Sequence, residues 1–156
     1  MEDHLFEAHE ELKRLEHIIY VTLKYTRTVD VLVNALQRLV DIYDLIINSY
    51  LMKAKQEGLI TAIPKSPGLC GTTLSELYSQ DEKLQKYLTF YVFLKTILNK
   101  PRKKREEFRR HVTLVVELDN ATAEVHIDNL VNCERFIHQF FRYAMKQVLG
   151  KSDEEE

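Results

Sequence analysis

The sequence predicts a mainly helical protein, arranged as a four-helix up-down bundle with one β-hairpin inserted before the last helix. Helix-breaking residues are rare, since the 156 residues include only four Gly and three Pro. Apolar residues recur every three or four positions through most of the chain, which is typical of amphipathic helices. Strict alternation of apolar and polar residues, typical of strands, is convincing only between residues 112 and 127.

The first predicted helix runs from Asp3 to about Lys24. Its inward face has helical spacing and comprises Leu5, Ala8, Leu12, Leu15, Ile19 and Leu23. No Gly or Pro follows, yet an unbroken helix over residues 3–57 would be about 80 Å long, far beyond the ~16 Å radius of gyration of a compact chain of this length. We therefore expect a break at residues 25–28 (YTRT), with Thr28 as the next N-cap. The alternative is a continuous kinked helix that pairs with a second subunit.

The second predicted helix carries a wide apolar stripe from Val29 to Ala54. Its eleven members are Val29, Leu32, Val33, Leu36, Leu39, Val40, Tyr43, Ile46, Ile47, Tyr50 and Ala54. The stripe is wider than the seam of a two-stranded coiled coil, and burying each large member contributes about 1.5–3 kcal/mol. We expect this helix to form the central wall of the bundle and to end at Gly58.

Residues 59–99 predict a loop, a short helical turn and a third helix. The loop, residues 59–73, contains two Pro and two Gly. Capping-box spacing at residues 73–76 and 79–82 indicates the turn and then the start of the helix, which we place from Asp81 to about Asn99. Its stretch FYVFL is apolar nearly all round, which predicts a central position for this helix.

The β-hairpin is predicted by two alternating segments that flank a turn at residues 119–120. With this turn, Leu118 lies opposite Ala121 and the remaining apolar residues of the two segments also lie opposite one another. The same register places His111 opposite Asp128. We expect Asp128 to cap the last helix and Gly150 to end it.

The composition predicts one domain and a cytoplasmic location. Residues 1–150 are expected to form a single helical-bundle domain, and residues 151–156 (KSDEEE) a disordered acidic tail. No stretch of about 18 apolar residues could span a bilayer, and the acidic start lacks the basic region of a signal peptide. Cys70 and Cys133 lack metal-site spacing, so we expect reduced thiols, with a single bridge between them as the alternative. We expect no cofactor, no metal and no membrane partner.

A basic segment, Lys100 to His111 (KPRKKREEFRRH), is the strongest functional signal. It holds seven Lys or Arg against two Glu in a chain whose formal net charge is −2. Such a cluster, with Phe108 inside it, could neutralise nucleic-acid phosphates. The candidate nucleic-acid-binding residues are Arg102, Lys103, Lys104, Arg109 and Arg110. The alternative is a solvated linker whose cations pair with acids elsewhere.

Arg105 and His111 are separated by five residues, shortly before the final helix. This spacing, in a helical protein of this size, resembles the HEPN superfamily, which includes metal-independent ribonucleases and toxin components. The resemblance implies that Arg105 holds a phosphate and that His111 acts as a general acid or base, with both residues meeting their symmetry mates in a homodimer. Those chemical roles are sensible for the two side chains. The resemblance therefore implies RNA binding or metal-independent RNA cleavage.

Two alternatives to that hypothesis remain open. The hairpin register independently predicts that His111 pairs with Asp128, which would give the imidazole a structural role. The apolar faces of the first two helices exceed what one short chain must cover, which fits a non-catalytic protein-protein interaction or dimerisation module. These hypotheses differ in whether Arg105 and His111 converge in a basic cleft.

Overall fold

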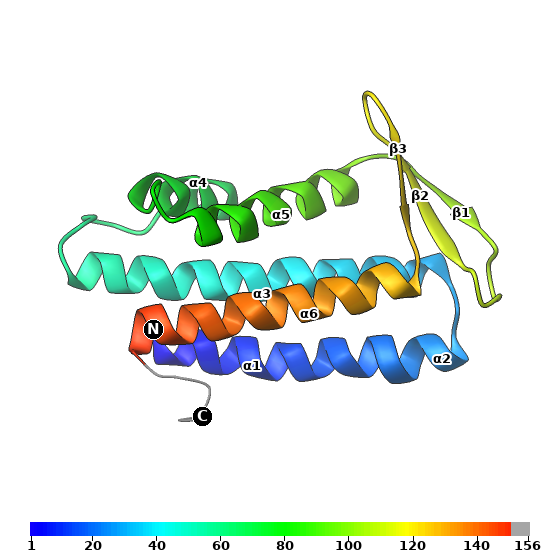
Figure 1. Ribbon diagram of the computed structural model, residues 1–156, viewed down its shortest axis with the longest axis horizontal. Helices are drawn as coiled ribbons and strands as arrows, with labels where there is room; N and C mark the ends of the chain where they lie inside the picture. The colour runs from blue at the N-terminus through cyan, green and yellow to red at the C-terminus, as the bar shows by residue number, and fades with distance from the viewer. Residues whose placement is uncertain (151–156) are drawn as a thin grey trace.

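The computed structural model describes residues 1–150, and its mainly helical character confirms the predicted class (Figure 1). The helices are α1 (Glu2–His17), α2 (Leu23–Tyr25), α3 (Val29–Gln56), α4 (Pro67–Leu77), α5 (Glu82–Asn99) and α6 (Ile127–Ala144), with π-helical turns at Ile18–Thr22 and Met145–Leu149. The strands are β1 (Arg102–Arg105), β2 (Thr113–Glu117) and β3 (Thr122–Val125). The predicted acidic tail, residues 151–156, lies outside the described residues.

The predicted break between the first two long helices is confirmed. α1 continues through the π-helical turn into α2, and the helix ends at Tyr25. Thr28 has extended backbone angles, and its Oγ1 accepts a hydrogen bond from the Val31 N–H at 3.3 Å. This cap satisfies one of the free N–H groups at the start of α3. The alternative of one continuous kinked helix is therefore wrong.

α3 is the central helix, as its apolar stripe predicted. It packs against α1, α4, α5, α6 and β2, and Figure 1 shows it between the α4–α5 layer and α1. All of the predicted stripe is buried except Val33, which is half-buried, and Ala35, Ile42 and Leu51 are buried as well. The extra buried positions follow from its place between two layers, because α3 is covered on more than one face.

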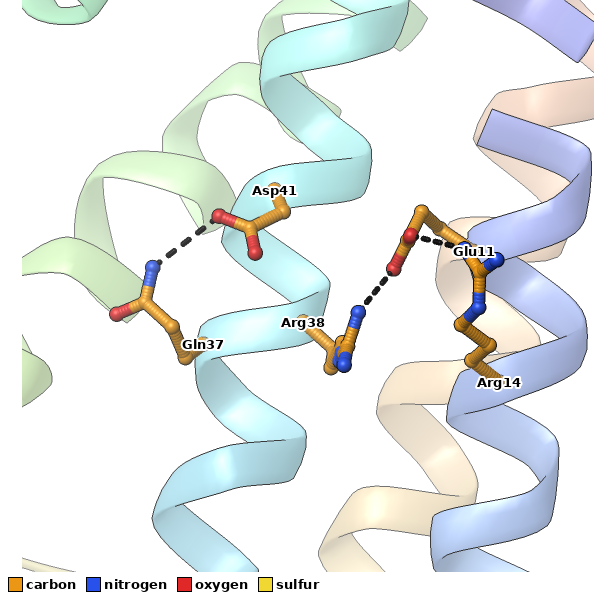
Figure 2. A network of polar contacts seen from close by, with 5 residues as sticks. All are labelled: Glu11, Arg14, Gln37, Arg38 and Asp41. Atoms are coloured by element: carbon orange, nitrogen blue, oxygen red, sulfur yellow. Dashed lines mark hydrogen bonds and ion pairs between the residues drawn. The ribbon is translucent and has the colours of Figure 1, made fainter. Parts of the chain in front are cut away.

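Polar side chains close the edge of the contact between α1 and α3. Figure 2 shows Arg38 of α3 reaching Glu11 of α1, with an Nη1–Oε2 distance of 2.7 Å, while Arg14 binds the other oxygen of the same carboxylate. On the far side of α3, the Gln37 amide donates to Asp41 at 3.2 Å. Glu11 thus joins the two helices at the margin of the core, where its charge stays partly hydrated.

The predicted four-helix up-down arrangement is not confirmed. With α1 and α2 counted as one continuous helix, residues 1–150 contain five helices, and the additional one, α4, begins inside the predicted loop. Pro67 occupies the first turn of α4, where its missing N–H costs no hydrogen bond. Gly71 lies where a Cβ atom would come within 3.2 Å of the Tyr91 ring. The Gly therefore allows α4 to approach α5 closely. The short turn predicted at residues 73–76 is the last part of this helix.

The third predicted helix is confirmed as α5, but its central position is wrong. Asp81 caps it, accepting from the Leu84 N–H at 3.1 Å. Its apolar stretch is not buried all round, since Val92 and Phe93 are exposed. α5 covers one side of α3 and presents these two side chains outward.

The predicted hairpin is confirmed, and it belongs to a three-stranded antiparallel sheet in the order β1-β2-β3. Leu114 pairs with Val125 and Val116 with Ala123, as the alternation predicted. The added strand is the basic segment itself, with Arg102 opposite Val116. All four residues of β1 are exposed, so its strand character comes from backbone pairing and not from an apolar face.

α6 begins at Ile127, two residues before the predicted start, with His126 and not Asp128 in the N-cap position. Asn129 Oδ1 accepts from the His126 N–H at 3.0 Å. The helical segment ends at Gly150 as predicted, where a φ of 72° suits Gly. Cys70 and Cys133 are free thiols, as expected. Within residues 1–150, no helix is long and apolar enough to cross a membrane.

Candidate nucleic-acid interface

The basic segment forms an exposed edge at one end of the molecule, where Figure 1 shows the sheet beside the end of α5 and the starts of α3 and α6. Lys104 Nζ lies 3.5 Å from Asp30 and 3.6 Å from Glu107, and Arg105 Nη2 lies 2.7 Å from Glu124. Four other cations form no ion pair with any residue in the range 1–150. These are Arg102, Lys103, Arg109 and Arg110. Acidic residues within the range 1–150 therefore neutralise only part of the basic segment.

The loop between β1 and β2 is fixed to the corner where α2 meets α3. The Phe108 N–H donates to the Arg27 carbonyl at 2.7 Å, and Glu107 Oε2 accepts from the Val29 N–H at 3.1 Å. Glu106 and Phe108 both adopt left-handed φ values, 58° and 65°. Residues other than Gly adopt this conformation only when their surroundings enforce it. The loop thus presents the Phe108 side chain, which is 76% exposed, beside Arg109 and Arg110 in the sequence.

A polar hollow of about 450 Å³ lies beside this loop. Two guanidinium groups, two imidazoles and one carboxylate line it, contributed by Arg27, Arg110, His111, His126 and Asp128. The Nε atom of Arg27 is buried and has no hydrogen-bond partner among the described residues. An unsatisfied buried donor of this kind is costly. The hollow therefore offers a donor-rich, mostly cationic surface that suits an anion such as phosphate.

The two residues that the HEPN resemblance implicates occupy different settings. Arg105 is paired with Glu124 across the sheet, whereas His111 is exposed and lines the hollow. Within residues 1–150, no hydrogen bond or ion pair joins their side chains. His111 and Asp128 share the hollow, as the register predicted, but the expected hydrogen bond between them is not formed in the described residues.

The sequence did not connect two residues of the hollow, Arg27 and His126, with the basic segment. His126 lies opposite Thr113 when the pairing of Leu114 with Val125 is extended by one residue, so the hairpin register could have identified it. Arg27 lies in the predicted break at residues 25–28, but no sequence pattern links that break to the basic loop. The link is the backbone hydrogen bond from Phe108.

Comparison with known proteins adds no further assignment, because no family model, no curated protein and no solved structure matches this chain. The function is therefore inferred from the charges, hydrogen bonds and exposed surface of these residues.

Proposed function

We propose that this protein binds RNA through the exposed cations of β1 and the following loop. The observation that carries the proposal is a set of four cations that form no ion pair within residues 1–150, on a strand and loop that are attached to the helical core. Because the backbone that carries these cations is already ordered, binding to phosphates requires only their side chains to become ordered, and it releases counterions. The exposed Phe108 ring adds a surface on which an unpaired base can stack. These features favour single-stranded RNA.

The more specific form of the proposal is metal-independent RNA cleavage in the polar hollow. Arg27 and Arg110 would bind the non-bridging oxygens of a phosphodiester. His111 would take the proton from the ribose 2′-hydroxyl, whose oxygen attacks the phosphorus as the bond to the 5′-oxygen breaks. The second imidazole, His126, would give a proton to that leaving oxygen. The products are a 2′,3′-cyclic phosphate and a 5′-hydroxyl end.

RNA binding is tested by fluorescence anisotropy with a labelled single-stranded RNA over a salt series. The test variant replaces Arg102, Lys103, Arg109 and Arg110 with Ser. The matched control makes the same change in charge at exposed lysines elsewhere: Lys55, Lys65, Lys86 and Lys146. We expect the test variant to bind roughly 100-fold or more weakly at low salt, and its logarithmic salt dependence to fall by about 3. Equal binding by the test variant and the control would contradict the proposal.

Cleavage is tested separately, by following a labelled RNA in buffer that contains EDTA. We expect H111A to abolish cleavage and to retain binding, since one imidazole contributes little to affinity. R105A distinguishes two arrangements: a hollow that works within one subunit keeps its activity, while the HEPN-like arrangement across a dimer loses it. Full cleavage by H111A would contradict catalysis and leave the binding proposal intact.

The second candidate function is a non-catalytic dimerisation module. It is supported by an apolar cavity of about 680 Å³ between α5, α6 and β3, lined in part by Phe90, Phe93 and Phe136. For this function, we expect the protein to be a dimer in solution and the F93S variant to be a monomer. A strictly monomeric mass by light scattering, over a wide concentration range, would contradict it.

A further inference from the structure

A second group of titratable side chains lies away from the basic sheet, between the first and last long helices. Glu16 comes from α1, and Glu134 and His138 come from α6. The four-residue separation on α6 places Glu134 and His138 on one helix face. His138 Nε2 lies 2.8 Å from Glu16 Oε1 and 3.0 Å from Glu134 Oε1. One ligand atom from each residue lies within 4.8 Å of the other two.

The charges in this group are incompletely balanced by the protein. Glu134 is only 7% exposed, and among residues 1–150 neither Glu134 nor Glu16 forms an ion pair with Lys or Arg. A buried carboxylate is costly without a charged partner. His138 directs one ring nitrogen at both carboxylates, and that nitrogen carries at most one proton. A single N–H therefore faces two anionic oxygens, so their negative charge is incompletely neutralised. A metal cation would neutralise it more fully.

The dimensions of the group suit a tetrahedral metal ion. Zn²⁺ binds imidazole nitrogen at about 2.0 Å and carboxylate oxygen at about 2.1 Å, so tetrahedral ligand atoms lie about 3.3 Å apart. The observed nitrogen-to-oxygen distances are a few tenths of an ångström shorter. Small side-chain rotations would open them, because Glu16 and His138 are only partly buried.

We propose that Glu16, Glu134 and His138 bind a first-row divalent transition-metal ion, with Zn²⁺ as the representative. One imidazole and two carboxylates form the protein's share of the coordination sphere, and the fourth position is left to water. The ion neutralises both carboxylates and links α1 to α6. This site is independent of the proposed RNA function, because none of its residues lines the polar hollow.

The residues around the group support a constrained site. The Tyr20 hydroxyl lies 3.5 Å from Glu134 Oε2, the carboxylate oxygen that does not contact His138. Tyr20 belongs to the π-helical turn that follows Glu16 closely in the chain. A residue placed against the outer oxygen restricts how the carboxylate can turn, which is a recurrent feature around metal ligands.

The test is calorimetric titration of Zn²⁺ into the full chain after removal of metal with EDTA, together with thermal unfolding with and without Zn²⁺. We expect one ion per chain and a higher Tm in its presence. E134Q and H138Q should each weaken binding by about tenfold or more and should lose the Tm increase. H17Q is the matched control, since His17 is an exposed histidine next to Glu16. Mg²⁺, which prefers oxygen ligands, should bind far more weakly.

Two outcomes would overturn the proposal. The first is the absence of Zn²⁺ binding to the unmodified chain at concentrations up to 100-fold above that of the protein. The second is Zn²⁺ binding that H138Q and H17Q reduce equally, because this would indicate weak capture by surface histidines. Circular dichroism shows whether each variant is folded. If E134Q fails to fold, the partly exposed E16Q provides the same test.

Discussion

The central helix α3 and the edge strand β1 use their side chains in opposite ways. Half of the 28 residues of α3 are buried, whereas all four residues of β1 are exposed. α3 packs against four long helices and the sheet, while β1 is held through its pairing with β2 and carries only cations. Apolar burial dominates folding free energy, and exposed charge contributes little to it. The fold and the proposed ligand surface should therefore respond to different substitutions.

The largest expected loss of folding stability comes from substitutions in the aromatic cluster that packs against α3. Phe140 is fully buried, and its ring lies 4.8 Å from that of Tyr87 and 5.2 Å from that of Tyr43. F140A should lower the free energy of unfolding by about 3–5 kcal/mol, measured by urea denaturation. F108A, the same substitution at an exposed ring, should change it by less than about 0.5 kcal/mol. A large loss with F108A would contradict the separation of core and ligand surface.

An intermediate effect is expected at Asp81, which joins α5 to the end of α6. Its carboxylate accepts from the Tyr143 hydroxyl at 2.6 Å and from the Gln147 amide at 3.1 Å, in addition to capping α5. D81A should cost about 1–3 kcal/mol, because it removes the cap and leaves these donors unpaired. D81N should lower the free energy of unfolding by less than D81A does, since Asn also caps helices.

The pH dependence of the unfolding free energy of D81N tests whether the charge of Asp81 contributes to stability. Burial raises the pKa of Asp81, but the hydrogen bonds from Tyr143, the Leu84 N–H and Gln147 outweigh it, so the pKa lies below its usual value. A lowered pKa in the folded state adds stability at neutral pH that is lost as the pH falls. The difference in unfolding free energy between the unmodified chain and D81N should therefore shrink between about pH 5 and pH 2. A constant difference would contradict a role for the charge.

The smallest effect on stability is expected from the four cations that form no ion pair within the described part of the chain. The variant with Ser at positions 102, 103, 109 and 110 should unfold within about 0.5 kcal/mol of the unmodified chain. The same variant is the one expected to lose RNA binding, so the two measurements form a pair. A loss above about 2 kcal/mol would show that these side chains support the fold, and the binding result would then need a milder substitution.

Sequence patterns predicted the elements whose side chains meet a core. The break at residues 25–28 followed from chain length and the capping side chain of Thr28, and the hairpin register followed from alternation. β1 was missed because RKKR buries no side chain and forms a strand through its backbone alone. The first part of α4 was missed because its Pro and Gly suit both a loop and a helix start, and only the close approach of Gly71 to Tyr91 distinguishes the two.

The candidate sites also combine residues that local sequence patterns indicated with residues that only tertiary contacts bring in. Arg110 belongs to a cluster of Lys and Arg that is visible in the sequence, and His111 was indicated by its spacing from Arg105 and by the hairpin register. Arg27 enters the hollow through a hydrogen bond between segments about 80 residues apart in sequence, which no local pattern encodes. Glu134 and His138 have the spacing of one helix face, but their third partner, Glu16, is more than 100 residues away in the chain. Tertiary packing therefore brings Arg27 and Glu16 into their sites.

The open edge of β1 also affects how copies of this chain meet. An edge strand presents unpaired backbone N–H and C=O groups, to which another strand could add. A second β1 placed there would bring cations opposite cations about 5 Å apart, which is destabilising. The positive charge proposed to attract RNA therefore also disfavours the pairing of β1 with a strand of another molecule. Neutralising this charge would favour aggregation.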